Sequence, residues 1–421
     1  MPAIQPMPSQ LRWQELEFGM FCHFGINTFA GTEWSDGSLD PAIFAPRQCD
    51  PAQWVATAQQ GGMRYLILTA KHHDGFCLWP TATTAYSVRA TPARIDVVGA
   101  TAAACRAAGM PFGLYLSPWD RHAPCYADPP AYDRFYTQQL TELCTRYGPL
   151  VELWFDGAGS EGRSYDWAAI LAVVRRHQPQ AMVFNMGDPT IRWIGNEDGL
   201  ADDPCFYVVD ATGGSAGTSA QVARREGARY CPPECDVPIR RNWFWQPDDR
   251  PTLKRLEHLL AIYYRSVGLG ANLLLNVPPD RAGRLDPHDR TRLLELAAEL
   301  RRRFTAPLRA RVAPSGAGAD LRFAAPITFD HLVLAEELTG GQRIDGYRVL
   351  DERGELLAHG RTIGHKKIHV FPARQARQLR VELDEPRARL RGAVAYHTSH
   401  EVLPALGPKL DDDAWGEKAM R

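Results

Sequence analysis

A carboxylate ends an apolar stretch of this 421-residue chain. Residues 150–156 read LVELWFD, so Asp156 follows a short apolar run that is typical of a strand covered on both faces. Burying a charge without a partner is costly. A carboxylate in this place therefore indicates the mouth of a site, outside the packed interior.

Other polar and aromatic residues follow the neighbouring apolar runs. His23 lies in the first run, and Glu33 and Trp34 follow it on a glycine-rich loop. The remaining ones are Lys71, His72, His73 and Asp74 after the second run, Tyr115, Trp119 and Asp120 after the third, and Asn185 at the end of the fifth. A lone histidine is more often a core residue that the backbone satisfies. If these strand ends share one rim, however, their side chains converge on one pocket.

Metal-assisted hydrolysis is one chemistry that such a pocket could support. A zinc hydrolase would need histidines spaced as HxH or HExxH, together with a carboxylate. His72 and His73 are adjacent, and consecutive side chains of a strand point to opposite faces. Cys231 and Cys235 also lack the spacing of a zinc knuckle. We therefore expect no metal and no cofactor.

Carbohydrate hydrolysis fits the residue types better. It requires two carboxylates across the glycosidic bond, neutral groups that bind hydroxyls, and an aromatic wall for the sugar ring. Asp156 supplies one carboxylate. The best candidate for the second is Glu197 in IRWIGNEDG, and its rival is Glu234 in CPPECD. Asp120 and Asp210 are less favoured candidates than either glutamate.

Alternating strands and helices must position these residues. Strands are predicted at 18–26, 65–71, 112–118, 150–156, 181–187 and 273–279, with one or two more hidden in 200–245. Helices are predicted at 50–60, 96–108, 131–147, 165–177, 252–267 and 287–303. This alternation favours a (β/α)8-like barrel of the α/β class. No G-x-G-x-x-G motif follows the first strand, which removes the strongest sign of a dinucleotide-binding alternative.

The character of the chain changes near residue 306. Short alternating runs with turns between them predict an antiparallel β-sandwich over 306–405, after a barrel at 1–305. No linker of low complexity separates the two, so we expect them to pack closely. The acidic tail, 406–421, is predicted to be disordered.

The charge balance excludes several classes of partner. With 48 basic against 49 acidic residues, the net charge of -1 gives no reason to expect a nucleic acid or a membrane as partner. The N-terminus lacks the pattern of a secretory signal, so we expect a soluble protein, either cytoplasmic or periplasmic. The nine cysteines form no disulfide framework and are expected to be reduced. The oligomeric state is not predicted.

Taken together, the motifs resemble those of the α-L-fucosidases of glycoside hydrolase family 29. The resemblance runs from about residue 11 to 300 and rests on motifs in this order: MFCHFG, TEW, KHHDGF, YLSPWD, LWFDG, RWIGNEDG and ECDVPIRRNWFW. KHHDGF and LWFDG in this order are specific together. The family implies a barrel followed by a β-sandwich, as the residue patterns also predict.

The resemblance implies roles for particular residues. Asp156 matches the catalytic nucleophile, and Tyr115 lies where a family tyrosine faces it. The acid/base residue varies in position between subgroups, so Glu197 is a prediction from its RWIGNE context, with Glu234 as the alternative. His23, His72 and His73 match the histidines that hold the fucose hydroxyls, Trp34 and Glu33 match a loop that contacts the same sugar, and Trp243 falls in the segment that closes the pocket.

The implied function is that of a retaining, exo-acting α-L-fucosidase. The segment at 234–245 is most similar to the subgroup that removes α-1,3- or α-1,4-linked fucose from oligosaccharides or glycoprotein glycans, although Asn242 stands where that subgroup often has glycine. Two alternatives are a carbohydrate-binding protein without turnover and a retaining glycosidase for another sugar, such as galactose.

Overall fold

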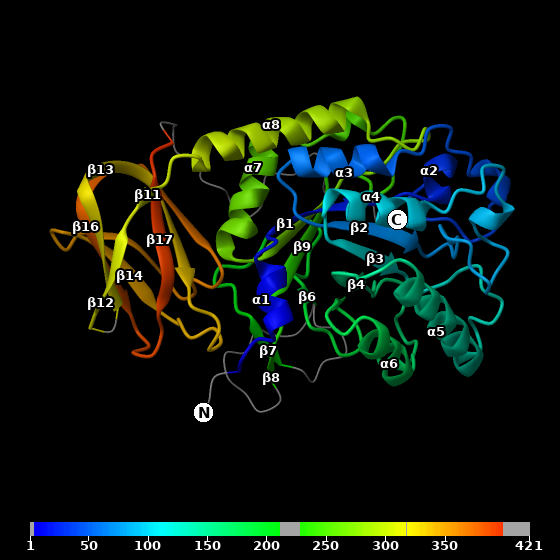
Figure 1. Ribbon diagram of the computed structural model, residues 1–421, viewed down its shortest axis with the longest axis horizontal. Coiled ribbons are helices and arrows are strands. Elements are labelled where there is room, and N and C mark those ends of the chain that lie inside the picture. The colour runs from blue at the N-terminus through cyan, green and yellow to red at the C-terminus, as the bar shows by residue number, and fades with distance from the viewer. Residues whose placement is uncertain (1–3, 211–227, 317, 399–421) are drawn as a thin grey trace.

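A barrel of parallel strands and a second, antiparallel sheet make up the protein (Figure 1). The computed structural model describes residues 4–210, 228–316 and 318–398. The barrel strands, in spatial order, are β5 (Met182–Phe184), β4 (Glu152–Trp154), β3 (Phe112–Leu116), β2 (Leu66–Lys71), β1 (Phe18–Cys22), β10 (Asn272–Asn276), β9 (Pro233–Pro238) and β6 (Arg192–Trp193). A single parallel bridge between Phe184 and Ile191 spans the remaining gap, so the barrel is nearly closed. The predicted fold class is confirmed.

One expectation about the strands was wrong, and one barrel strand was not predicted. The first strand stops at Cys22, and a short helix, α2 (Ile26–Ala30), begins where the strand was expected to end. One or two strands were expected in 200–245, and among its described residues β9 joins the barrel, as expected. The other barrel strand, β6, lies upstream of that region and was not predicted. In that region β7 (Val208–Asp210) and β8 (Ala228–Tyr230) instead pair with each other in a separate sheet. A strand of two residues leaves too short an apolar run to be recognised.

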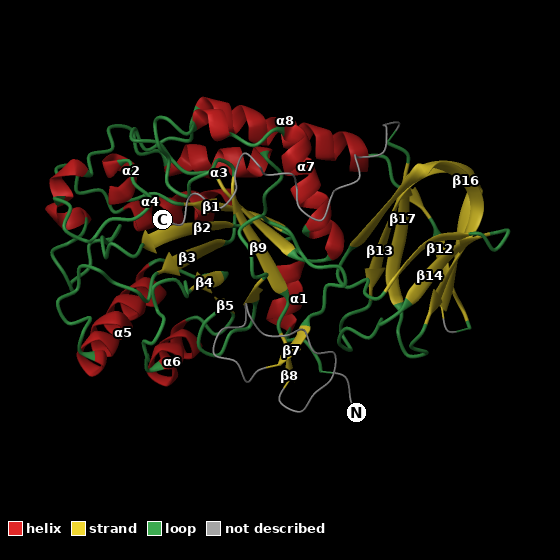
Figure 2. Cartoon of the chain, turned by 180° about the vertical axis from the view of Figure 1, so that it is seen from behind, coloured by secondary structure: helices red, strands yellow, loops and turns green. Residues whose placement is uncertain are grey.

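Helices cover the outside of the barrel (Figure 2). They are α3 (Pro51–Gln60), α4 (Val97–Ala108), α5 (Pro129–Arg146), α6 (Trp167–His177), α7 (Leu256–Arg265) and α8 (Pro287–Phe304). An aspartate precedes most of them, and the side chains of Asp50, Asp96, Asp128 and Asp166 each accept a backbone N–H of the first turn. This capping explains why the starts of these four helices were predicted to within two residues. The helix α7, which has no side-chain cap, begins four residues after its predicted start at 252.

The interior of the barrel holds two acids, Glu152 and Glu234, the second of which was the alternative candidate for the acid/base. Glu152 accepts a hydrogen bond from Trp13 Nε1 at 3.0 Å, and Trp13 belongs to α1 (Pro8–Gln14). Glu234 accepts from the Tyr65 hydroxyl at 2.6 Å and from Trp154 Nε1 at 3.2 Å. Burial raises the pKa of Glu152 well above its usual range and that of Glu234 to about 7. Both acids are fully buried among aromatic side chains.

The antiparallel sheet folds over on itself as a β-sandwich. Its strands are β11 (Leu308–Arg309), β12 (Arg311–Ser315), β13 (Gly318–Glu336), β14 (Tyr347–Asp351), β15 (Leu356–Gly360), β16 (Lys367–Leu383) and β17 (Leu390–Tyr396). The long strands β13 and β16 pair through two breaks in register; the first half of β13 pairs with β12, and its second half with β17. A separate hydrophobic core fills the space between the layers. Residues 399–421, including the predicted tail, lie outside the described residues.

Polar contacts join the barrel to the sandwich. Glu17 at the start of the barrel binds Lys366 Nζ at 2.5 Å and lies 3.1 Å from His365 Nε2. The Tyr207 hydroxyl donates to the carbonyl of Gly270 at 2.7 Å and accepts from the backbone of His365 at 2.8 Å. The two parts therefore pack against each other, and α8 runs from one toward the other (Figure 1). Among the described helices, none is both long and apolar enough to cross a membrane.

Candidate active site

The carboxylate that ends β4 is held at the mouth of the barrel. Asp156 Oδ2 accepts a hydrogen bond from the Tyr115 hydroxyl at 2.9 Å, and Oδ1 accepts the backbone N–H of Ala158 at 2.9 Å. Nε2 of His73 lies 3.6 Å from Oδ2. The Asp156 side chain is 23% exposed, while its two partners on β3 and after β2 are almost fully buried. The carboxylate is thus both oriented and accessible.

The two adjacent histidines lie close together because β2 ends before them. β2 stops at Lys71, and the ring centroids of His72 and His73 are only 4.1 Å apart. The strand geometry that would separate their rings does not apply to them. His73 Nδ1 lies 2.7 Å from the hydroxyl of Ser117. Burial lowers the pKa of both imidazoles, although the charge of Asp156 opposes the shift at His73.

His23 follows β1 and joins the same cluster of rings. Oδ1 of Asn276 lies 3.1 Å from the backbone nitrogen of His23 and 3.0 Å from its Nδ1. The ring centroid of His23 is 5.7 Å from that of His72 and 5.9 Å from that of Tyr115. Burial lowers the pKa of His23 to about 3, so the imidazole is neutral at physiological pH. All three histidines meet at one rim.

A loop after β9 brings an indole over this cluster. The backbone N–H of Trp243 donates to the carboxylate of Glu33 at 3.0 and 3.1 Å, and its Nε1 donates to Glu197 Oε2 at 3.3 Å. The Trp243 ring lies 4.9 Å from that of His23. Phe244 packs its ring edge-on against His23 at 5.5 Å. The loop therefore connects both glutamates to the histidine cluster.

The pKa of both glutamates is raised above the usual carboxyl value. Burial raises the pKa of Glu33 to about 8, against the hydrogen bonds from the backbone of Trp243 and Phe244. The surrounding protein also raises the pKa of Glu197, and the negative charge of Asp156 adds to this effect. Glu197 is nevertheless on the exposed side of its loop, so desolvation of its carboxyl group is incomplete.

An exposed indole forms another part of the rim. Trp34 is 49% exposed and packs edge-to-face against His73 and Trp119, with ring centroids 5.3 and 5.5 Å away. Gly159, three residues after Asp156, has φ +68, and a Cβ there would lie 2.0 Å from the Trp119 ring. The second glycine of DGAG is therefore required for this contact.

Several residues predicted near the site have other partners. Lys71 Nζ pairs with Asp120 Oδ2 at 2.8 Å, and both side chains are buried, so this carboxylate is not available as a second catalytic acid. Glu234, the rival of Glu197, points into the barrel interior and is bound there as described above. The side chain of Asp210 lies outside the described part of the chain.

The other polar residues at strand ends support loops. Asp74 accepts from the Asn27 side chain at 3.0 Å and from the backbone of Phe76 at 2.7 Å. Asn185 adopts a left-handed conformation with φ +66 just after β5. Asn242, where the family pattern often has glycine, donates to Asp249 Oδ2 at 3.4 Å. Its amide therefore braces the loop that carries the indole.

Three residues of the site were not predicted. Ser117, Asn276 and Phe244 contact the imidazoles of His73 or His23, as described above. Each lies within or beside a predicted strand end or motif. A small polar residue there carries no signal until the fold places it beside a histidine.

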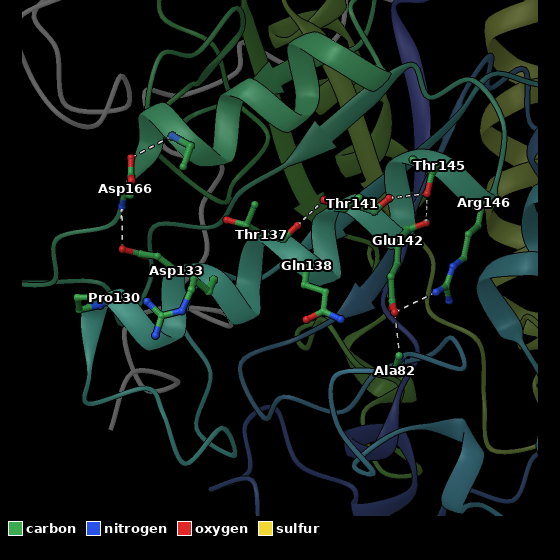
Figure 3. A pocket seen from close by; sticks show the side chains of 12 residues that line it. Ala82, Pro130, Asp133, Thr137, Gln138, Thr141, Glu142, Thr145, Arg146 and Asp166 are labelled. Carbon is green, nitrogen blue, oxygen red and sulfur yellow. Dashed lines mark hydrogen bonds and ion pairs between the residues drawn. The ribbon is translucent and has the colours of Figure 1, made fainter.

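A hollow lies outside the barrel, along α5 (Figure 3). Its volume is about 870 Å³, and its lining includes Thr137, Thr141 and Glu142. The Thr141 hydroxyl donates to the carbonyl of Thr137, and Glu142 accepts from Arg146 Nη2 and the backbone of Ala82. These groups satisfy one another, so we place the candidate active site at the barrel mouth. Within the described ranges, no three His, Cys, Asp or Glu side chains come together as a metal site would require.

Comparisons with known proteins identify the family of the chain. The family described as Alpha-L-fucosidase matches residues 39–303. Alpha-L-fucosidase 1 of Arabidopsis thaliana is 36% identical over 436 residues, covering 91% of this chain and 86% of the relative. A glycoside hydrolase family 29 member from a rumen bacterium is 33% identical, with a TM-score of 0.88 over 97% of this chain and 80% of that one.

A further solved structure is that of a family 29 fucosidase of Ruminococcus gnavus in complex with fucose. It is 29% identical, with a TM-score of 0.84, and the match covers 95% of this chain and 97% of that one. The match to the family spans more than half of the chain, and the solved relatives share the whole fold. The chain therefore belongs to the α-L-fucosidases of glycoside hydrolase family 29.

Proposed function

We propose that this glycoside hydrolase removes terminal α-L-fucose with net retention of configuration, using Asp156 as nucleophile and Glu197 as acid/base. The observation that carries the proposal is the position of Asp156, which is held by the Tyr115 hydroxyl at the barrel mouth beside His73. A carboxylate that is oriented and partly exposed is suited to attack an anomeric carbon.

The reaction has two steps. Asp156 attacks the anomeric carbon while Glu197 donates a proton to the departing oxygen, and a covalent fucosyl-enzyme forms. Glu197 then acts as a base on a water molecule, whose attack releases fucose and frees Asp156. The raised pKa of Glu197 supports its role in the first step, because a general acid must be protonated before it acts.

Recognition of the sugar rests on the neutral rings. His23, His72 and His73 each offer hydrogen-bonding nitrogen atoms to hydroxyl groups, and Glu33 adds a carboxyl group. Burying the C6 methyl of fucose contributes only about 0.8 kcal/mol, so hydroxyl contacts must supply most of the selectivity. The R. gnavus relative was crystallised with fucose, which supports the same sugar here.

The exposed rim is the region for the rest of the substrate. Trp34 and Trp243 present indole rings beside the histidine cluster, and rings of this kind suit the C–H face of a neighbouring sugar. Together with the resemblance at 234–245, this supports an exo-acting enzyme for α-1,3- or α-1,4-linked fucose on oligosaccharides or glycoprotein glycans.

The proposal can be tested by following hydrolysis of an aryl α-L-fucoside by proton NMR. Early release of the α-anomer supports retention, whereas early release of the β-anomer contradicts it. A panel of α-1,2-, α-1,3-, α-1,4- and α-1,6-fucosylated oligosaccharides tests linkage, and we expect the 1,3- and 1,4-linked members to be cleaved fastest. Preferential cleavage of another linkage would contradict the assignment of linkage while leaving the family activity intact.

The same assay addresses the alternatives of a different sugar and of binding without turnover. An aryl α-L-galactoside has the same configuration as the fucoside at every ring carbon and differs from it only by a hydroxyl group at C6. We expect the fucoside to have the higher kcat/KM. A higher value for the galactoside would favour a galactosidase, and binding of fucose with no release from any substrate would favour a carbohydrate-binding protein.

A further inference from the structure

The protonation pattern of two buried histidines can be read from their neighbours. The Ser117 hydroxyl lies 2.7 Å from the carbonyl oxygen of Trp119 and 2.7 Å from Nδ1 of His73. A carbonyl oxygen cannot donate a hydrogen bond, so the proton of Ser117 must point to Trp119. The Ser117 oxygen is then an acceptor, and Nδ1 of His73 must carry the proton that it accepts.

The same reasoning applies to His23. The Asn276 amide nitrogen lies 2.8 Å from the carbonyl oxygen of Trp243, so Nδ2 donates there. Its Oδ1 accepts the backbone N–H of His23 at 3.1 Å, which fixes the orientation of the amide twice over. Because Oδ1 can only accept, Nδ1 of His23 at 3.0 Å must be the donor.

We infer that Ser117 and Asn276 are positioning residues that hold His73 and His23 as neutral Nδ1–H tautomers, so that each imidazole presents its Nε2 lone pair to the sugar. The inference rests on the proposed function for the identity of the ligand. Two fucose hydroxyls would then act as hydrogen-bond donors to the Nε2 atoms of His73 and His23. Nε2 of His73 lies 3.6 Å from Asp156 Oδ2. In this tautomer both atoms are acceptors, so a hydrogen-bond donor is needed between them.

Solution NMR of the full-length, sugar-free protein with ¹⁵N-labelled histidine tests the tautomers directly. Signals are assigned by their loss in His23→Gln and His73→Gln. We expect a protonated Nδ1 and an unprotonated Nε2 for both rings in the wild type. The opposite pattern at both would overturn the inference whether or not the enzyme cleaves fucosides.

Two variants test the positioning residues. Ser117→Ala should change the tautomer balance of His73 alone, and Asn276→Ala that of His23 alone, whereas Asn276→Asp keeps the acceptor and should preserve the Nδ1–H form. Ser87→Ala is the matched control, because Ser87 is also fully buried but its hydroxyl has no hydrogen-bond partner among the residues that the structure describes. An unchanged His73 pattern in folded Ser117→Ala would refute the role of Ser117, and an unchanged His23 pattern in folded Asn276→Ala that of Asn276.

Sugar analogues test the consequence for recognition. L-fucose is compared with its 2-, 3- and 4-deoxy and deoxyfluoro analogues by calorimetry, since fluorine cannot donate a hydrogen bond. At two of the three positions the fluoro analogue should bind as weakly as the deoxy analogue, about tenfold below fucose. Fluoro analogues that bind like fucose at every position would contradict the inference. Failure of fucose itself to bind would refute the proposed function, while the NMR result would still decide the tautomers.

Discussion

The Tyr115 hydroxyl donates a 2.9 Å hydrogen bond to Oδ2 of Asp156, and the tyrosine is almost completely buried while the aspartate is partly exposed. The phenol therefore fixes the carboxylate from the inside of the barrel and leaves its other side open. Burial raises the pKa of Tyr115 well above its usual range, and the neighbouring charge of Asp156 adds to this, so the phenol remains a donor at all working pH values.

Tyr115→Phe should lower kcat/KM for aryl fucosides by about 10- to 100-fold, the loss expected for one hydrogen bond to a charged group. Tyr136→Phe is the matched control, because the Tyr136 hydroxyl is also buried but donates to the carbonyl of Leu116 at 2.8 Å. The control should lose stability without losing activity. Equal kinetic losses in the two variants would argue against a direct role for Tyr115.

Glu197→Ala should reduce hydrolysis of natural oligosaccharides by about 10²- to 10⁴-fold, because their leaving groups need protonation. An aryl fucoside with a good leaving group should still form the covalent intermediate, and azide should restore its turnover. Glu33→Ala is the comparison variant. Burial raises the pKa of Glu33 to about 8, and Glu33 accepts from the backbone of Trp243, the residue whose side chain contacts Glu197. Azide rescue in Glu33→Ala alone would transfer the acid/base role to Glu33.

The pH profile of the wild type carries the same information. Desolvation by burial is the main cause of the raised pKa of Glu197. The protonated acid therefore persists above the ordinary carboxyl pKa and is lost as the pH rises through the raised pKa. We expect kcat/KM for an oligosaccharide to fall on the alkaline side, and this fall should be weaker for a nitrophenyl fucoside. Identical alkaline limbs for the two substrates would contradict general-acid catalysis by this group.

Lys71→Met tests a residue of KHHDGF that we assign to folding. The substitution leaves Asp120 buried without its cation and should cost about 3–5 kcal/mol of unfolding free energy. The folded fraction should keep its kcat/KM, measured after correction for active protein. A stable variant without activity would place Lys71 in the catalytic machinery instead.

The strand ends show how far the sequence alone could lead. Asp156, His72 and His73 were placed at a common rim because parallel strands end at one face of a barrel. The pairing of Lys71 with Asp120 could not be predicted, because it depends on how the loop after β3 turns back toward β2. Glu234 points into the barrel because the side chains of a strand alternate between its two faces. The prolines and cysteines around Glu234 hide this alternation in the sequence, so its position could not be predicted either.

The helices were predicted more closely than the strands. Aspartates before α3, α4, α5 and α6 mark their starts, whereas β6 contains two residues and offers no periodicity. The positions of Ser117 and Asn276 beside histidines follow from register between strands that are far apart in the chain. Such contacts are set by the closed barrel and have no local signature.

The buried acids Glu152 and Glu234 predict an unusual pH dependence of stability. Burial raises the pKa of both, so the folded protein keeps protons that the unfolded chain releases above the ordinary value of 4.5. Their contribution is fully present below that pH and is lost as the pH rises toward about 7, the value for Glu234. Glu152→Gln removes one titrating group, so its Tm relative to the wild type should increase between pH 5 and pH 8.

Glu142→Gln is the control with the opposite sign. Glu142 also accepts an indole N–H, from Trp79 at 2.7 Å, but its hydrogen bonds and Arg146 outweigh its desolvation and lower its pKa. Its contribution is present above the ordinary carboxyl pKa, so the relative Tm of this variant should decrease as the pH rises. A difference in Tm that is constant with pH for Glu152→Gln would contradict the raised pKa of Glu152 in the barrel interior.

Trapping of the covalent intermediate tests the central claim most directly. Incubation with 2-deoxy-2-fluoro-α-L-fucosyl fluoride, digestion and peptide mass spectrometry should locate one added fluorofucosyl group on the peptide that contains Asp156, and Asp156→Asn should remain unlabelled. Labelling of a different carboxylate, or unchanged labelling of Asp156→Asn, would contradict the assignment of Asp156 as the nucleophile.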